Sequence, residues 1–133
     1  MFTLDDRLAA DTLDLARWPL SRVRLMNDAT YPWVILVPAR AGVREIIELD
    51  APDRASLMEE IARASRALAA ITRPDKLNVA ALGNVVAQLH VHIIARFTTD
   101  AAWPRPIWGV RAAVPYGAAA VAEFRRRFLA AAG

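Results

Sequence analysis

The chain contains no cysteine, and this absence excludes a disulfide framework, a zinc–thiolate site and thiol chemistry. No apolar run reaches the roughly 18 residues that a membrane-spanning helix needs. The first 15 residues, MFTLDDRLAADTLDL, are acidic and lack the basic and apolar regions of a secretory signal peptide. We therefore expect a cytoplasmic protein with no membrane partner.

Lysine is almost as scarce, because 16 of the 17 basic residues are arginine. The net charge is only +3, and the arginines are scattered apart from FRRRF at 124–128, which is typical of a solvated helix face. This distribution does not favour nucleic-acid binding, which needs basic residues gathered on one surface. The length predicts a single domain over residues 1–133, and the hydrophobic content of 56% leaves apolar surface for a partner subunit.

The hydrophobic pattern predicts an α+β fold. Residues 12–38 contain three stretches with the alternation or the buried run of β-strands. A long helix begins at Asp50, whose carboxylate can cap the first turn. Two more strands are expected over 76–82 and 87–97, followed by an irregular Pro/Trp-rich segment, 101–109, and a C-terminal helix. This order favours an antiparallel sheet of about five strands with one main helix and one C-terminal helix.

Both histidines of the chain lie in one short stretch, ALGNVVAQLHVHIIAR, at residues 81–96. On an extended strand, alternate side chains share a face and lie about 6.5–7 Å apart, so Gln88, His90 and His92 are expected to point the same way. Each buried polar group that lacks a hydrogen-bond partner costs about 1–3 kcal/mol. A packed strand gains nothing from such a row, and we therefore predict that this face lines a cleft.

Three chemistries are open to the histidine pair. A metal site would need further carboxylate ligands, and none lies nearby in the sequence. A general acid–base pair would need a nucleophile that the sequence does not nominate. Alternatively, one imidazole is itself the nucleophile and attacks phosphorus to form a phosphohistidine-type intermediate, with neighbouring donors holding the phosphoryl oxygens.

Residues 88–94, QLHVHII, resemble the signature of the histidine triad (HIT) superfamily, His-φ-His-φ-His-φ-φ, with glutamine in place of the first histidine. LGN before this motif resembles the glycine and amide residue of the family. LMNDATYPWVILVP at 25–38 resembles the run in which Asp or Asn precedes a proline and a buried strand. The resemblance covers about residues 20–105 and implies a HIT-like fold.

The resemblance also implies a function, namely hydrolysis or transfer at the α-phosphorus of a nucleoside 5′-phosphoryl compound of the dinucleoside polyphosphate or phosphoramidate type. Its catalytic residues would be His90, the nucleophile that forms a nucleotidyl-histidine, His92, which holds phosphate charge, and Gln88, in the orienting position of the first histidine. The substrate would be a nucleotide or nucleotide conjugate. No protein-bound metal or other cofactor is implied, although Mg²⁺ can arrive with a polyphosphate, and members of the family are often homodimers.

Three substrate contacts follow from the same resemblance. Asn27 occupies the position that binds ribose hydroxyls, Asn84 is the amide after the glycine, and Arg96 is the basic residue that ends the motif strand. Two departures set this chain apart: Val85 stands where a hydroxyl residue serves the leaving group, and Trp33 stands where many members carry a further histidine. These departures, together with Gln88, favour an alternative function, a nucleotide-binding module with weak turnover.

Overall fold

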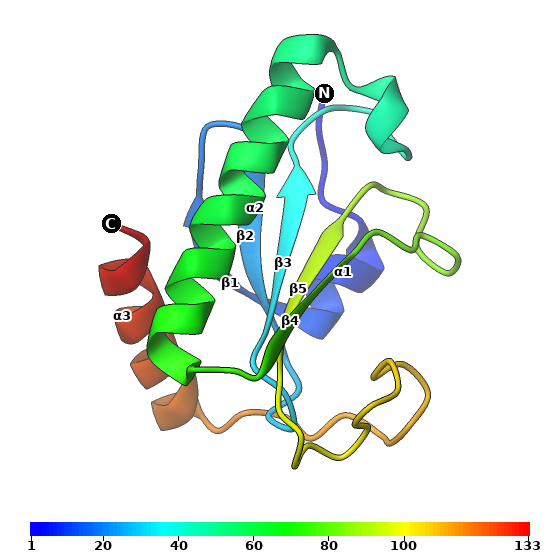
Figure 1. Cartoon of the computed structure of the whole chain (residues 1–133). Helices are drawn as coiled ribbons and strands as arrows, with labels where there is room; N and C mark the ends of the chain where they lie inside the picture. The colour runs from blue at the N-terminus through cyan, green and yellow to red at the C-terminus, as the bar shows by residue number, and fades with distance from the viewer.

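The computed structural model describes the whole chain, residues 1–133, and contains one five-stranded antiparallel sheet in the order β1-β2-β3-β5-β4 (Figure 1). The strands are β1 (Thr12–Arg17), β2 (Ser21–Met26), β3 (Trp33–Pro38), β4 (Lys76–Ala80) and β5 (Val91–Arg96). The predicted α+β class and the five-stranded sheet are confirmed.

The two strands predicted over 76–82 and 87–97 both extend too far into the stretch of chain that joins β4 to β5. Residues 81–90 form an irregular loop between β4 and β5. Gly83 lies in the left-handed region, with φ of +72°, where a strand cannot continue. His90 therefore lies just before β5 and His92 lies on it.

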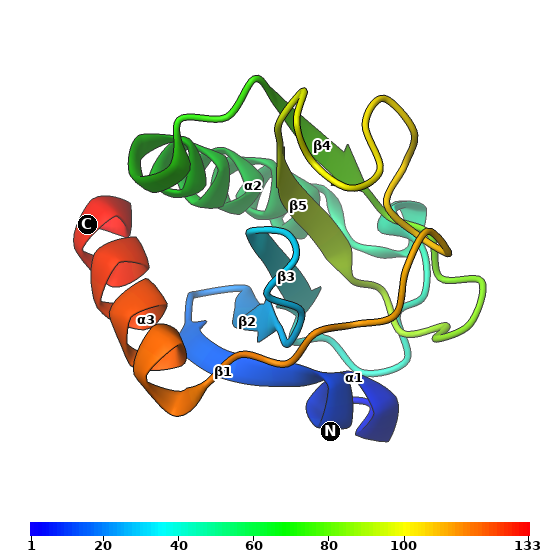
Figure 2. The same ribbon diagram turned by 90° about the horizontal axis from the view of Figure 1, so that it is seen from below.

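Helices cover both faces of the sheet, as Figure 2 shows from below. The elements are α1 (Asp6–Asp11), a 3-10 turn η1 (Ile46–Glu48), α2 (Ala51–Thr72) and α3 (Ala118–Ala132). The predicted cap of the long helix is confirmed, because the Asp50 carboxylate accepts a hydrogen bond from the Asp53 amide at 2.9 Å. None of the helices combines the length and apolar character that a bilayer crossing requires.

The sheet separates two hydrophobic cores, which explains why every residue of β3 and β5 is buried. The larger core packs α2 and α3 against one face, and includes Leu57, Leu68 and Phe128. The smaller core lies on the α1 face and includes Leu8, Tyr31, Trp33, Ile35, Val37, Ile94, Ala102 and Ile107. The segment between β5 and α3, residues 97–117, thus covers the same face of the sheet as α1 (Figure 2). It is called the closing segment below.

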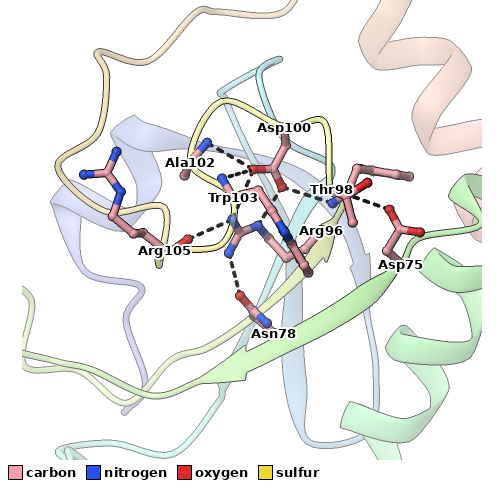
Figure 3. Close-up of polar contacts among 9 residues, drawn as sticks. Asp75, Asn78, Arg96, Thr98, Asp100, Ala102, Trp103 and Arg105 are labelled. Carbon is pink, nitrogen blue, oxygen red and sulfur yellow. Dashed lines mark hydrogen bonds and ion pairs between the residues drawn. The ribbon is translucent and has the colours of Figure 1, made fainter.

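A buried ion pair fixes that closing segment to the end of β5 (Figure 3). The Arg96 guanidinium, on a residue only 1% exposed, donates to both carboxylate oxygens of Asp100 at 2.8 and 3.1 Å. It also donates to Asn78 Oδ1 on β4 and to the Arg105 carbonyl. The carboxylate accepts three further backbone bonds, from Phe97, Ala102 and Trp103. The Arg96 guanidinium, helped by these backbone amides, lowers the pKa of Asp100 to about 2.

Replacing Asp100 should therefore be costly. We expect Asp100→Asn to lower the free energy of unfolding by about 3 kcal/mol, because the buried Arg96 charge loses its partner. Equilibrium urea unfolding measures this difference. The matched control is Glu123→Gln, which removes an ion pair to Arg126 whose two side chains are 56% and 69% exposed, and should leave stability unchanged. Equal effects of the two substitutions would contradict a structural role for the buried pair.

Candidate active site

The two histidines lie side by side on the α1 face of the sheet. Their ring centroids are 4.9 Å apart, with an interplanar angle of 68°. Both residues are buried, at 7% and 4% exposure, but both line a cavity of about 360 Å³. The cleft predicted for this stretch is present. Its wall comprises Arg7, Leu8, Asp11, Met26, Trp33, Leu82, Gly83, Asn84, Val85, Val86, His90, His92 and Trp108.

The main chain determines the tautomer of His90. Its Nδ1 lies 2.6 Å from the carbonyl oxygen of Gln88. Because a carbonyl oxygen can only accept a hydrogen bond, Nδ1 carries a proton, and in the neutral ring Nε2 keeps a free lone pair. A neutral imidazole with an available Nε2 lone pair is a competent nucleophile.

A side chain determines the opposite tautomer in His92. The indole Nε1 of Trp33 lies 3.0 Å from His92 Nδ1 in a buried hydrogen bond. An indole N–H can only donate, so Nδ1 of His92 accepts and its proton is on Nε2. Burial, with a smaller contribution from the neighbouring His90, lowers the pKa of His92 to about 3. This imidazole is therefore neutral at pH 7 and presents an N–H donor.

The Gln88 side chain serves the N-terminal segment and does not line the cavity. Its Oε1 accepts from the Asp5 amide at 2.8 Å, and its Nε2 donates to the Thr3 carbonyl at 2.8 Å. Asp5 in turn caps α1 through the amides of Arg7 and Leu8. Leu89, Val91 and Ile93 belong to the larger core on the opposite face, so the alternation of the chain is kept, but the Gln88 amide bonds the N-terminal segment.

The three residues predicted to bind substrate lie in three different places. Asn84 lies on the wall of the histidine cavity. Asn27 lines an adjoining cavity of about 350 Å³, and its Oδ1 accepts from the Tyr116 amide. Arg96 lines neither cavity, because its guanidinium is committed to Asp100 under the closing segment. Sequence reasoning placed Arg96 at a strand end, and the structure buries it.

Two parts of the wall were not predicted. Trp108 packs edge-on against His92 with ring centroids 5.1 Å apart, and against Trp33 at 6.0 Å. The sequence placed Trp108 in the irregular segment 101–109 and assigned it no role. The other part is α1, which contributes Arg7 and Asp11. Trp33, Trp108, Met26 and Asp11 line both cavities, so the two adjoin along this face.

The chain contains no group of three or more His, Asp or Glu side chains arranged to hold a metal ion. The acid–base and nucleophilic interpretations of the histidine pair need no such group. Both are compatible with the geometry, in which one ring presents a lone pair and the other presents a hydrogen-bond donor.

The lowered pKa of His92 should make the protein less stable in acid. The folded protein keeps this ring neutral down to about pH 3, whereas an unfolded chain protonates histidine near pH 6.5. Between these values the unfolded state binds more protons, so the His92 contribution is complete above about pH 6.5 and declines as the pH falls. The slope is at most about 1.4 kcal/mol per pH unit.

Urea unfolding of wild type and His92→Asn between about pH 6 and pH 4 isolates this contribution, since other titrating groups are shared. The asparagine oxygen can still accept from Trp33. We expect the free energy of unfolding to fall more steeply with decreasing pH in the wild type. Parallel curves would show that His92 protonates normally in the folded protein.

Comparison with known proteins places this geometry in a family. The chain matches the family model of the HIT domain over residues 10–99. A histidine triad protein from Bradyrhizobium japonicum is 52% identical, with a TM-score of 0.97 over 99% of this chain and 98% of the other. One from Sinorhizobium meliloti is 42% identical, with a TM-score of 0.96 and coverage of 98% and 96%. A third, from Marinobacter aquaeolei, is 47% identical, with a TM-score of 0.94 and coverage of 96% and 93%.

No curated protein matches the chain. The domain match covers well over half of its length, and the three structures superpose on nearly all of it. The resemblance inferred from residues 20–105 is therefore confirmed: the chain belongs to the histidine triad family.

Proposed function

We propose that the protein cleaves nucleoside 5′-phosphoryl compounds at the α-phosphorus, as a hydrolase or nucleotidyl transferase that passes through a nucleotidyl-histidine on His90. The observation that carries this proposal is the pair of opposite tautomers in one cavity. His90 offers an Nε2 lone pair, and His92 offers an Nε2–H donor. Attack on phosphorus needs one group of each kind.

The first step forms the bond from His90 Nε2 to phosphorus and breaks the bond from phosphorus to the leaving group, which departs with its electron pair. The imidazole becomes cationic, and the Nδ1–H bond to the Gln88 carbonyl stabilises that charge. The N–H of His92 stabilises negative charge on the phosphoryl oxygens. Water then attacks phosphorus and loses a proton to solvent, and the bond from phosphorus to His90 Nε2 breaks with its electron pair returning to the ring, which releases the nucleoside monophosphate.

The two adjoining cavities supply room for the nucleoside. We place the phosphate beside the histidines and the nucleoside toward the second cavity, where Asn27 would contact the ribose and Trp108 would contact the base. Asn84 would lie near the phosphoryl or leaving group. Any Mg²⁺ would enter with a polyphosphate substrate, because the proposed step uses no metal held by the protein.

A nucleotide-binding module with little turnover is the second candidate. It is favoured by Val85, which lines the cavity and has no hydroxyl to offer, and by Gln88, whose amide is occupied by the N-terminal segment. Neither observation concerns His90, the proposed nucleophile. The two candidates therefore differ in a single measurable event, the formation of a bond to His90.

We also propose a second copy of this chain as a partner. The edge strand β4 leaves its outer backbone groups unpaired within the sheet, and its Val79 is 48% exposed. Apolar residues on an edge strand favour pairing with another strand. A homodimer that joins two sheets at this edge would agree with the resemblance on which the expectation rests.

Trapping the adduct tests the proposed chemistry. The protein is mixed with adenosine 5′-phosphoramidate or diadenosine polyphosphates, quenched within seconds and measured by intact mass. We expect a nucleotidyl adduct on the wild type with at least one of these substrates and with neither on His90→Ala, because only the wild type carries the Nε2 nucleophile.

His92→Asn is the matched variant, since it keeps the nucleophile and removes only the Nε2–H donor. Adduct formation should then slow on the order of 100-fold or more, the usual loss for one oxyanion donor. Binding of the nucleotide to the wild type without adduct or product would establish the binding module instead.

A further inference from the structure

Trp33 is the only group that contacts Nδ1 of His92 by a hydrogen bond, at 3.0 Å, and the contact joins β3 to β5 across the sheet. We propose that Trp33 is a positioning residue that holds His92 as a neutral Nε2–H donor, so that the site selects leaving groups that depart as stable anions. This inference rests on the proposed function and specifies the substrate class within it.

Protonation of His92 would break the contact with Trp33. A doubly protonated ring would aim its Nδ1–H at the indole N–H, and two donors cannot bond to each other. Trp33 cannot withdraw easily, because it is 8% exposed and belongs to the smaller core. The loss of a buried hydrogen bond therefore adds to the cost of burying a positive charge on His92, beside the ring that becomes cationic when it bonds to phosphorus.

No neighbouring group provides the missing proton. The elements packed around His92 present few charged or titratable side chains: His90 on the same chain segment, and Arg7 and Asp11 from α1. The Nδ1 proton of His90 is held by the Gln88 carbonyl. Arginine does not release its proton, and an ionised carboxylate only accepts.

The remaining residues that line the histidine cavity carry no acid. Glu45 lines a separate cavity of about 200 Å³ that His90 also borders, and an ionised carboxylate only accepts. Val85, at the position where family members carry a hydroxyl residue, is a hydrocarbon, and Asn84 has an amide that does not give up a proton. Trp33, Trp108 and Met26 complete the wall as apolar or weakly polar groups.

The leaving group must consequently depart without a proton. When the bond from phosphorus breaks, the departing atom retains the electron pair. A phosphate, polyphosphate, carboxylate or acidic phenol is stable in that form, whereas an amine or an alkoxide needs a proton in the transition state. The site therefore favours phosphoanhydrides and mixed anhydrides of a nucleoside monophosphate over phosphoramidates and alkyl esters.

The tautomer is tested without any substrate. Long-range ¹H–¹⁵N correlation spectra of the histidine side chains distinguish protonated from unprotonated ring nitrogens. In the wild type we expect His92 Nδ1 to be unprotonated from about pH 8 to pH 5, within the range above its lowered pKa of about 3. A protonated Nδ1, or a titration near pH 6.5, would overturn the inference.

Trp33→Phe should remove the constraint on the tautomer, so that Nδ1 of the neutral His92 ring carries the proton in part of the molecules, since phenylalanine keeps most of the packing but has no N–H. The matched control is Trp108→Phe, because Trp108 also packs on His92 but makes no hydrogen bond to it. Identical His92 spectra for the Trp33 variant and the wild type would overturn the positioning role.

Selectivity is tested with the wild type alone, so it does not depend on a variant that folds. We compare kcat/KM for the 4-nitrophenyl and phenyl esters of adenosine 5′-monophosphate, which differ only in the stability of the departing anion. General acid catalysis contributes about 100-fold or more, so its absence should leave the nitrophenyl ester faster by at least about that factor.

Each outcome has a distinct meaning. Rates within about 10-fold of each other would show that a proton is delivered and would overturn the inference while leaving the proposed function intact. No turnover of either ester and no adduct on His90 would remove the proposed function itself and the leaving-group claim with it. The ¹H–¹⁵N spectrum of His92 would still test, independently of any activity, whether Trp33 determines the tautomer of this ring.

Discussion

The chemistry of the site depends on two hydrogen bonds to Nδ1 atoms. A carbonyl oxygen contacts Nδ1 of His90 and an indole N–H contacts Nδ1 of His92, at 2.6 and 3.0 Å. The first partner only accepts and the second only donates, so the two rings hold opposite tautomers 4.9 Å apart. In the proposed reaction, one imidazole forms a bond to phosphorus while the other supports the oxygens that gain charge.

The fold holds these partners rigidly. β3 and β5 lie at the centre of a sheet that is covered on both faces, so the strand carrying Trp33 and the strand carrying His92 are both fully buried. The closing segment, which places Trp108 against His92, is held in position by the buried ion pair between Arg96 and Asp100. The arginine that resembles a phosphate ligand in the sequence therefore contributes to the wall of the site indirectly, through the backbone it holds.

Much of the fold could be predicted because its signals are local. The strand alternation, the Asp50 cap and the order of elements gave the sheet and its main helix, and the histidine spacing located the cleft. The contacts that were not predicted join residues far apart in the chain: 59 positions separate Trp33 from His92, and 83 separate Asp5 from Gln88. The hydrophobic periodicity of a strand or helix contains no information about which distant residues it will contact. Trp33 was singled out as a departure, but its partner becomes visible only when β3 lies beside β5.

The most direct test of the account is a crystal structure with adenosine 5′-(α,β-methylene)diphosphate, whose bond beyond the α-phosphorus cannot be cleaved. We predict that the α-phosphorus lies about 3–3.5 Å from His90 Nε2, the distance of a near-attack arrangement. One α-phosphoryl oxygen should accept a hydrogen bond from His92 Nε2. A nucleotide bound with its α-phosphate away from His90, or with His92 Nε2 facing no phosphoryl oxygen, would contradict the account.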